Sequence, residues 1–178
     1  MSEISFVEPS EKHEAAVLDF KSEMLGKEAA IIHGAPLLEE FAEYSDWLRL
    51  VRNDFSVSPK AEGWLAATTL LAFRQSDDRL LGIINIRPEL NDFLREFGGS
   101  IGFSVRPSER QHGYATAMLE HALDYSRNLG LDEVLLSCYT ENDASRNTIL
   151  KCGGQLKFES HFPNGRPMQM YTIKLSIS

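Results

Sequence analysis

The sequence has few cysteines, and their arrangement suggests neither a metal site nor a disulfide framework. Only Cys138 and Cys152 are present, and neither belongs to a CxxC pair. In a reducing compartment, two such thiols are more often small buried apolar residues than a disulfide. We therefore predict no metal centre.

Long hydrophobic runs are also missing. The longest mostly apolar stretch, at 64–73, contains two threonines and is too short to cross a bilayer. The first residues, MSEISFVEPSEKHE, show no positively charged leader followed by an apolar stretch, which a secretory signal requires. We therefore expect a cytoplasmic protein that does not bind membranes.

Positive charge is in deficit. Eighteen Lys and Arg residues stand against 26 Asp and Glu residues, which gives a net charge of -8. A chain of this charge repels a phosphate polymer, so we expect no nucleic-acid partner. A cationic or amine-bearing substrate would be mildly attracted, although an acidic balance is also the ordinary condition of a soluble cytosolic protein.

Two common phosphate-binding loops are absent. The sole Gly-Lys pair, Gly26-Lys27, is followed by Glu28 and lacks an upstream glycine at the required spacing, and no GxGxxG occurs. Neither a nucleotide kinase nor a dinucleotide enzyme is indicated.

The sequence has the composition of one globular domain. It has 178 residues, of which 43% are hydrophobic, and no Pro/Gly/Ser-rich linker divides it, so we predict a single domain over 1–178. The N-terminal third predicts a strand at ISFVE, a helix over 10–25 capped by Ser10, and a second helix over about 37–55. The apolar stripe expected on that second helix consists of Leu38, Phe41, Trp47, Leu48, Val51 and Phe55.

The remaining two thirds predict mostly strands. Three consecutive antiparallel strands are expected at 63–74, 79–88 and 100–107, separated by QSDD and by a polar stretch around 90–99. A helix over 115–129 ending at Gly130, a buried strand over 133–140 and a short helix over 143–154 follow. The last pair, 155–162 and 167–176, forms a hairpin around Asn164-Gly165. The strand-helix-strand order in the middle implies a parallel crossover.

The run RQHGYATAML at 110–119 lies where a strand turns into a helix, so unpaired backbone N–H groups converge there. Gly113 allows a positive φ and close approach of a ligand, while the helix dipole adds roughly 0.3–1 kcal/mol per favourable charge. Arg110 and His112 add cationic or polar donors. The pattern favours an anion site. The alternative is that Gly113 only eases a turn and that Ser108 or Glu109 only caps the helix.

Residues Arg110 to Ala115 resemble the [RQ]-x-x-G-x-[GA] acyl-CoA motif of the GNAT N-acetyltransferase superfamily, with a strand and Pro107 before them as in that family. A second landmark follows, because Asn142 and Ser145 match the N-x-x-[SA] step after the strand EVLLSCYTEN. The resemblance covers about 98–160 well, and the remaining strands follow in order.

The resemblance implies an α/β fold of the GNAT type. Its central sheet is mixed and mostly antiparallel, with about seven strands, a splayed parallel pair and about four flanking helices. The slot between the splayed strands would take acetyl-CoA as co-substrate, with no metal. Backbone groups of Phe103, Ser104 and Val105 would pair with the pantetheine arm. The pyrophosphate would be held by the region of Arg110, Gln111, His112, Gly113, Tyr114, Ala115 and Thr116.

The resemblance places Asn142 and Ser145 beside the pantetheine end, with Asn142 facing the thioester. The alternative for Asn142 and Asp143 is a helix N-cap pair, and both can hold. The family's usual glutamate and tyrosine positions carry Ser100 and Ile149 here. We take Tyr139 and Glu141 as substitute proton carriers.

Other candidates are weaker. Tyr171 is a third candidate proton carrier, and His161 could titrate near neutrality. The acceptor pocket is expected from the first two helices, the final hairpin, the polar stretch before 100 and the neighbourhoods of Trp47 and Trp64. The acidic residues that could attract an amine are Glu39, Glu40, Glu43 and Asp92.

The predicted function is transfer of an acetyl group from acetyl-CoA to a primary amine of a small molecule or peptide. The alternative is a non-catalytic acyl-CoA sensor or interaction module, which the missing glutamate and tyrosine favour. The last strand could pair with a second copy, and the resemblance implies dimers, which are common in that family, so a homodimer is also expected.

Overall fold

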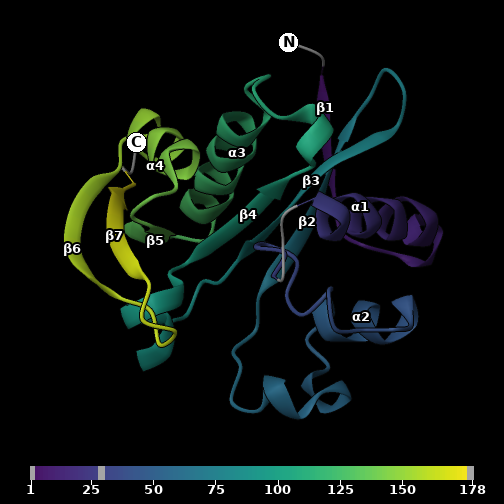
Figure 1. Ribbon diagram of the computed structural model, residues 1–178, viewed down its shortest axis with the longest axis horizontal. Coiled ribbons are helices and arrows are strands. Elements are labelled where there is room, and N and C mark those ends of the chain that lie inside the picture. Colours follow the sequence, from purple (N-terminus) through teal and green to yellow (C-terminus); the bar gives the residue numbers. More distant parts are fainter. Residues whose placement is uncertain (1–2, 28–30, 176–178) are drawn as a thin grey trace. The chain divides into compact units, whose positions relative to one another are not determined.

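The computed structural model describes residues 3–27 and 31–175. By its internal contacts the chain divides into two compact units, one of Met1–Asn85 with Phe103–Ala115 and one of Ile86–Gly102 with Thr116–Ser178. The α-helices of the described residues are α1 (Glu14–Lys27), α2 (Tyr44–Val51), α3 (Tyr114–Asn128) and α4 (Asp143–Lys151) (Figure 1). The strands are β1 (Ile4–Val7), β2 (Thr68–Arg74), β3 (Arg79–Ile86), β4 (Ile101–Val105), β5 (Glu133–Tyr139), β6 (Gln155–His161) and β7 (Pro167–Lys174).

The predicted fold class is confirmed, since the described part of the chain holds seven strands and four α-helices. The strands form two hydrogen-bonded sheets, one of order β1-β2-β3-β4 and one of order β5-β7-β6. A single domain over 1–178 and the parallel pairing across the central helix stay predictions. No helix within 3–27 or 31–175 has the length and apolar character to cross a membrane.

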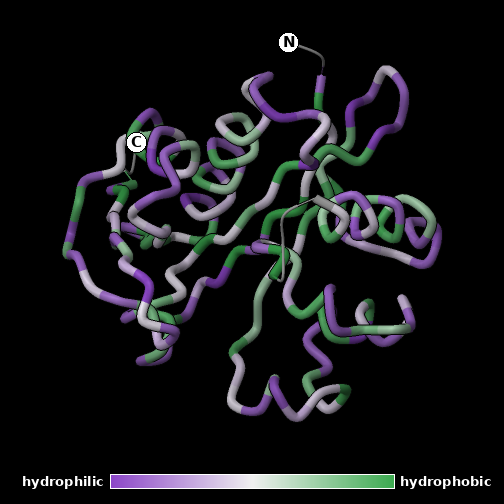
Figure 2. The backbone as a smooth tube through the Cα atoms, viewed as in Figure 1, coloured by the Kyte–Doolittle hydropathy of each residue, from purple (hydrophilic) through white to green (hydrophobic). Residues whose placement is uncertain are grey.

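The first unit has its core between one sheet and two helices. β1 pairs antiparallel with β2, from Ile4 opposite Arg74 to Val7 opposite Leu71. β3 is buried along nearly all its length, which accounts for its nearly continuous apolar sequence. Figure 2 shows these strands as largely hydrophobic and the loop between β2 and β3 as hydrophilic. The buried residues that join the helices to the sheet are Val17, Phe20, Met24, Trp47, Leu48, Leu71, Leu80 and Ile83.

The second predicted helix is wrong in extent. It was expected over about 37–55, whereas α2 runs only from Tyr44 to Val51. Leu37 adopts a φ of 54°, and turn bonds such as Glu40 N to Leu37 O at 2.9 Å replace a helical ladder. The Trp47 indole also donates to Pro36 O at 3.0 Å, which fixes this turn against the helix. Of the expected apolar stripe, Phe41 and Phe55 are half-buried and the other four residues are buried, and Leu38 lies in the loop before α2.

The strand expected over 63–74 begins late, at Thr68. Gly63 has a φ of 78°, Trp64 N bonds to Ala61 O at 3.1 Å, and Ala67 N bonds to the Asn53 side chain at 3.0 Å. These amides are committed to loop contacts and cannot join a sheet. The polar stretch expected as a spacer is partly helical, with a π-helical turn over Leu94–Gly98.

The second unit is built on a sheet whose last strand lies in the middle. β7 pairs antiparallel with β5 on one side and with β6 on the other. The expectation that this last strand offers an edge to a second copy is therefore wrong, because both of its edges are occupied. Leu135, Met168 and Met170 form a buried cluster with half-buried aromatic residues against them.

α3 ends next to the predicted Gly130, whereas α4, expected over 143–154, ends at Lys151. At the end of α3, Gly130 has a φ of 81°, and its amide bonds to Arg127 O at 2.9 Å. α4 covers Asp143–Lys151, and the hairpin turn falls at Asn164-Gly165.

One close backbone contact fixes the segment that leads into β4. Ser100 N donates to Leu135 O at 2.6 Å, and Leu135 N donates to Ser100 Oγ at 2.9 Å. Gly99, with a φ of 69°, lies so near that a Cβ there would be 2.6 Å from Leu135 O. Only glycine fits at this position.

We expect Gly99→Ala to destabilise the protein more than Gly130→Ala, a matched control that also has a positive φ but nothing within 4 Å of its Cβ position. The control should lose roughly 1–2 kcal/mol from the left-handed backbone alone. Gly99→Ala should lose at least about 2 kcal/mol more, because main-chain atoms must move. Urea unfolding measures both, and equal losses would contradict the close contact.

Candidate functional site

The chain makes a sharp corner between β4 and α3. β4 ends at Val105, a 3₁₀ turn spans Pro107–Glu109, and α3 begins at Tyr114. Between them Arg110 is extended, with a φ of -71° and a ψ of 163°. Gln111 and Gly113 have positive φ values of 63° and 82°. Alternation of this kind turns successive N–H groups toward one side and makes an anion-binding concavity.

The amides of this corner are available to a ligand. Gln111, His112 and Gly113 are exposed, and within the described residues their main-chain N–H groups have no hydrogen-bond partner. The first amides of α3 add to them, since the first turn of a helix has no internal acceptor. This arrangement suits a phosphate or diphosphate.

Arg106 anchors the start of the corner and is only 2% exposed. Its Nε donates to Leu80 O at 2.8 Å, and its Nη1 lies 2.7 Å from Asp19 Oδ2 and 2.8 Å from Glu23 Oε2. Both carboxylates come from α1. A buried guanidinium needs such pairing, because a lone buried charge is costly.

Glu109 is held by two arginines from the β2–β3 hairpin. Arg74 Nη1 donates to Glu109 Oε2 at 2.8 Å and also contacts the Tyr114 hydroxyl at 3.3 Å. Arg79 Nε forms an ion pair with Glu109 Oε1 at 2.7 Å, although its N–H is not aligned for a hydrogen bond. Hydrogen bonds from Arg74 hold the pKa of the Glu109 carboxyl below its usual value, against the opposing effect of burial.

The capping alternative for this corner is wrong. α3 begins at Tyr114, so neither Ser108 nor Glu109 is in the N-cap position. Ser108 N instead donates to Glu23 Oε1 at 2.7 Å, and the Ser108 hydroxyl accepts from Arg79 at 3.1 Å. Ser108 and Glu109 therefore both belong to the ion-pair network. Neither of them caps the exposed amides of Gln111–Gly113.

The predicted pantetheine-pairing residues lie on β4, which is an edge strand of its sheet. The Ser104 hydroxyl donates to His33 O, and Arg110 Nε donates to Val105 O at 3.1 Å. Phe103 and Ser104 are half-buried, as expected for an edge that is partly covered.

In the second unit, Asn142 is the N-cap of α4. Its side-chain oxygen accepts from Ser145 N at 3.1 Å, and Asn142 N donates to Tyr139 O at 2.9 Å. The capping alternative is therefore confirmed for Asn142. Its carboxamide oxygen is used by the helix, which leaves the amide NH₂ for any other role.

Tyr139 and Glu141 come together at a residue that sequence reasoning missed. The Arg166 guanidinium forms an ion pair with Glu141 and lies 3.5 Å from the centre of the Tyr139 ring. Nothing local in the sequence marks Arg166, because it is brought there by the pairing of β5 with β7. The only signal was its place just after Asn164-Gly165, at the predicted hairpin turn.

Ser100 and Ile149 have structural roles, because the Ser100 hydroxyl accepts from Leu135 N and Ile149 is fully buried. The weaker candidate proton carriers are Tyr171 and His161. The Tyr171 hydroxyl donates to Gln169 at 2.8 Å, and burial raises the pKa of Tyr171. His161 is exposed.

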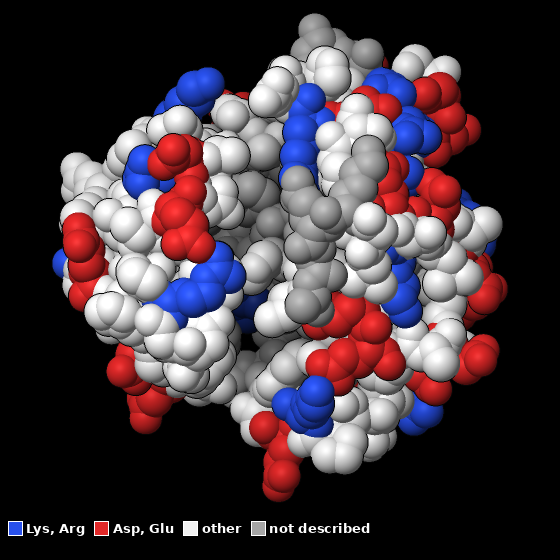
Figure 3. All heavy atoms as spheres, viewed as in Figure 1, with Lys and Arg blue, Asp and Glu red and all other residues white. Residues whose placement is uncertain are grey.

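The expected acidic and aromatic acceptor residues of the first unit are partly committed elsewhere. Trp47 is fully buried and belongs to the core. Glu40 pairs with Lys60 at 2.7 Å, and Glu39 accepts from Ile32 N at 3.3 Å while burial raises its pKa. Glu43 is exposed. On the face shown in Figure 3, acidic and basic side chains of the described residues are interspersed and form no broad basic surface.

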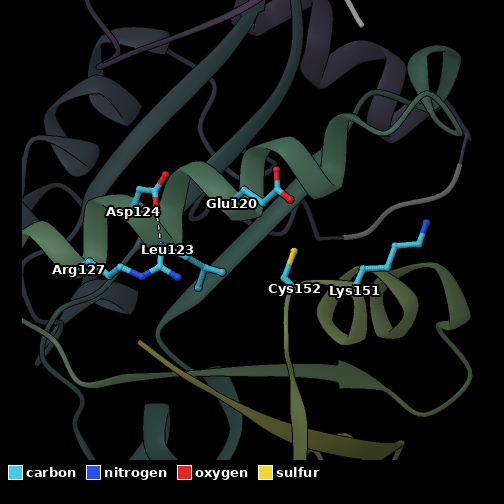
Figure 4. A pocket seen from close by; sticks show the side chains of 6 residues that line it. All are labelled: Glu120, Leu123, Asp124, Arg127, Lys151 and Cys152. Atoms are coloured by element: carbon cyan, nitrogen blue, oxygen red, sulfur yellow. Dashed lines mark hydrogen bonds and ion pairs between the residues drawn. The ribbon is translucent and has the colours of Figure 1, made fainter. Parts of the chain in front are cut away.

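A hollow of about 420 Å³ lies between α3 and the end of α4. Figure 4 shows the Cys152 side chain directed toward α3 and an ion pair between Asp124 and Arg127. Burial, and then the nearby Glu120 carboxylate, raise the pKa of the Cys152 thiol, so it is a poor nucleophile. Cys138 is buried, and both thiols are free. Across residues 3–27 and 31–175 no group of His, Cys, Asp and Glu could hold a metal ion.

Comparison with known proteins relates most of the chain to one family. The family profile described as an acetyltransferase (GNAT) domain matches residues 9–155. A search of curated proteins found no match.

Solved structures agree in fold. An acetyltransferase of the GNAT family from Streptococcus pneumoniae is 18% identical, with a TM-score of 0.67 over 98% of this chain and 100% of that one. The dodecameric spermidine N-acetyltransferase from Vibrio cholerae is 16% identical, with a TM-score of 0.65 over 97% and 94%. The protein yncA from Salmonella typhimurium, solved with acetyl-CoA, is 14% identical, with a TM-score of 0.64 over 98% and 95%.

We expect Glu109→Gln to lower the free energy of unfolding by about 1–2 kcal/mol at neutral pH, because the charge-assisted bonds to Arg74 are lost. Glu109 stabilises the fold fully above the unfolded pKa of about 4.3, and this contribution disappears as the pH falls through the lower folded pKa. The difference between wild type and variant should therefore shrink below about pH 4.3.

Urea unfolding between pH 7 and pH 3.5 measures this difference. Asp124→Asn, which breaks an exposed ion pair with Arg127, is the control and should change stability by less than about 0.5 kcal/mol. A wild-type advantage over Glu109→Gln that is unchanged at pH 3.5 would contradict the role given to Glu109.

Proposed function

Because the chain belongs to the GNAT acetyltransferase family, we propose that it transfers an acetyl group from acetyl-CoA to a primary amine of a small molecule or peptide. The observation that carries this proposal is the exposed corner of Gln111–Gly113, whose amides have no partner within the described residues. Such a corner suits the diphosphate of coenzyme A.

In this proposal the corner and the edge strand β4 bind the cofactor. The amides of Gln111 to Thr116 hold the diphosphate, with Arg110 and His112 as neighbouring donors. The main chain of Phe103 to Val105, at the edge of its sheet, pairs with the amides of the pantetheine arm. Asn142 and Ser145 are assigned to the pantetheine end. Acetyl-CoA, when bound, supplies the acetyl group as a thioester.

The acceptor nitrogen must lose a proton. An alkyl ammonium with a pKa of about 10.4 is neutral in only about one part in 10³ near pH 7.4, a handicap of about 4 kcal/mol. Ser100 and Ile149 give no help, since one is hydrogen-bonded to the main chain and the other has no proton to exchange. We assign proton handling to Tyr139 and Glu141, and hydrogen bonding near the reacting carbonyl to the Asn142 side-chain NH₂.

The acceptor is a cationic amine in this proposal. The net charge of -8 favours such a substrate, and the fold is shared with an enzyme named for spermidine. Polyamines therefore belong among the acceptors to be tried. A homodimer and a cytoplasmic location remain part of the proposal.

A second candidate is an acyl-CoA sensor without catalysis. It is favoured by one observation, namely that both substitute proton carriers, Tyr139 and Glu141, are already in contact with Arg166. Such a sensor would bind the same cofactor at the same corner.

We expect purified protein to release free thiol from acetyl-CoA in the presence of at least one member of a panel of alkyl amines, polyamines and peptide N-termini. Thiol formation is followed with a chromogenic disulfide reagent, and the acetylated amine is identified by mass spectrometry. Cofactor binding without thiol release for any amine would favour the sensor.

We expect Gly113→Glu to weaken coenzyme A binding by at least about a hundredfold. A carboxylate at about 4 Å from a phosphate charge costs roughly 4 kcal/mol near a protein surface. Calorimetric titration with coenzyme A measures the effect. Gly130→Glu is the matched control, because Gly130 also has a positive φ and lies at the far end of α3. Unchanged affinity in a folded Gly113→Glu variant would remove the corner as the cofactor site.

A further inference from the structure

The tip of the β6–β7 hairpin is fixed against the end of β5. Gly165 N bonds to Phe162 O at 2.8 Å, and Phe162 N bonds to Arg166 O at 2.9 Å, which closes the turn. Thr140 N then bonds to Pro167 O at 3.0 Å, so the tip lies beside the residues that follow β5.

The tip also holds the Tyr139 ring in one orientation. Phe162 packs edge-on against the ring with centroids 4.8 Å apart, and Asn164 Nδ2 lies 3.4 Å from the Tyr139 hydroxyl. One face of the ring is covered by the Arg166 guanidinium, whose Cζ is 3.5 Å from the ring centre. The same guanidinium pairs with the Glu141 carboxylate. A fixed aromatic face and a carboxylate thus converge on one cation.

We propose that the Tyr139 ring and the Glu141 carboxylate form a binding site for an ammonium or guanidinium group of an incoming molecule, and that Arg166 occupies this site in its absence. An aromatic face together with a carboxylate is the combination by which proteins recognise organic cations. In the proposed function this cation is the acceptor amine, and the inference rests on the proposed function in that respect alone.

Arg166 is held weakly enough to be displaced. Its side chain is 48% exposed and that of Glu141 is 61% exposed. Exposed ion pairs and exposed cation–π contacts are each weak. Together they keep the site closed in most molecules but leave about a tenth of them open. An external cation therefore binds with an apparent dissociation constant about tenfold weaker than an emptied site would give.

A cation site and a purely structural role for Arg166 predict opposite changes in cation affinity when Arg166 is removed. If Arg166 only clamped the hairpin to β5, its removal would loosen the tip and leave cation affinity unchanged or lower. If Arg166 occupies a cation site, its removal exposes Tyr139 and Glu141 and raises that affinity. Glu141→Gln separates the roles further, because it removes the charge that would hold either cation.

The experiment is a titration of the full chain with 1,4-diaminobutane, followed by the backbone amide NMR signals of residues 139–141 and 164–166. The neutral analogue 1,4-butanediol is the control ligand and should leave these signals unmoved. We expect Arg166→Gln to lower the apparent dissociation constant of the diamine about threefold to tenfold relative to wild type. Glu141→Gln should abolish the shifts.

Arg127→Gln is the matched control variant. It removes one exposed arginine that pairs with an aspartate on α3, and so changes the net charge equally. It should bind the diamine as wild type does. Equal or weaker binding by Arg166→Gln, equal tightening by Arg127→Gln, or shifts with butanediol would each overturn the proposal. The titration requires no acetyl transfer, so absence of thiol release would count against the proposed function alone.

Discussion

The buried guanidinium of Arg106 is the interaction on which the rest of the candidate cofactor site depends. The guanidinium donates to the main-chain oxygen of Leu80, near the start of β3, and pairs with the carboxylates of Asp19 and Glu23 on α1. An arginine so deeply buried must be paired, since an uncompensated charge there would cost several kcal/mol. The position of α1 and the direction in which the chain leaves β4 are therefore fixed together.

The same network explains how an acidic protein can present an anion site. Glu23 also accepts from Ser108 N, and Glu109 lies between Arg74 and Arg79. The carboxylates near the corner are therefore all paired, Asp19 and Glu23 with Arg106 and Glu109 with Arg74 and Arg79. The exposed end of the corner, Gln111–Gly113, presents amide dipoles, whose direction favours phosphate.

Hydrophobic pattern predicted the fold where burial is regular. β3 is buried along nearly all its length, β5 is buried from Val134 to Leu136 and at Cys138, and α3 ends next to the glycine that terminates its pattern. The pattern failed to predict the structure around residues 37–43, where the apolar side chains lie on a loop instead of a helix. The positive φ of Leu37 and the bond from the Trp47 indole to Pro36 set that loop. Both depend on tertiary contacts that spacing does not contain.

The candidate site divides in the same way. The corner could be predicted because its amides, its glycine and the helix start are contiguous in sequence. The partners of the residues after β5 could not, since Glu141 and Arg166 meet only through the register that places Tyr139 opposite Met168. The sequence shows only that Ser100 stands where a glutamate is usual. In the structure its hydroxyl accepts a hydrogen bond from Leu135 N and so holds the segment before β4 in place.

The place of β7 in the middle of its sheet has a consequence for biosynthesis. β5 and β6 are made earlier, yet neither pairs with the other, and each waits for the strand that ends at Lys174. During translation β5 and β6 therefore emerge before their shared partner, and each keeps an unpaired edge until residues 167–174 have left the ribosome. A chain that stops short of residue 167 would lose the shared partner of both strands, and such a fragment would be a substrate for chaperones and proteases.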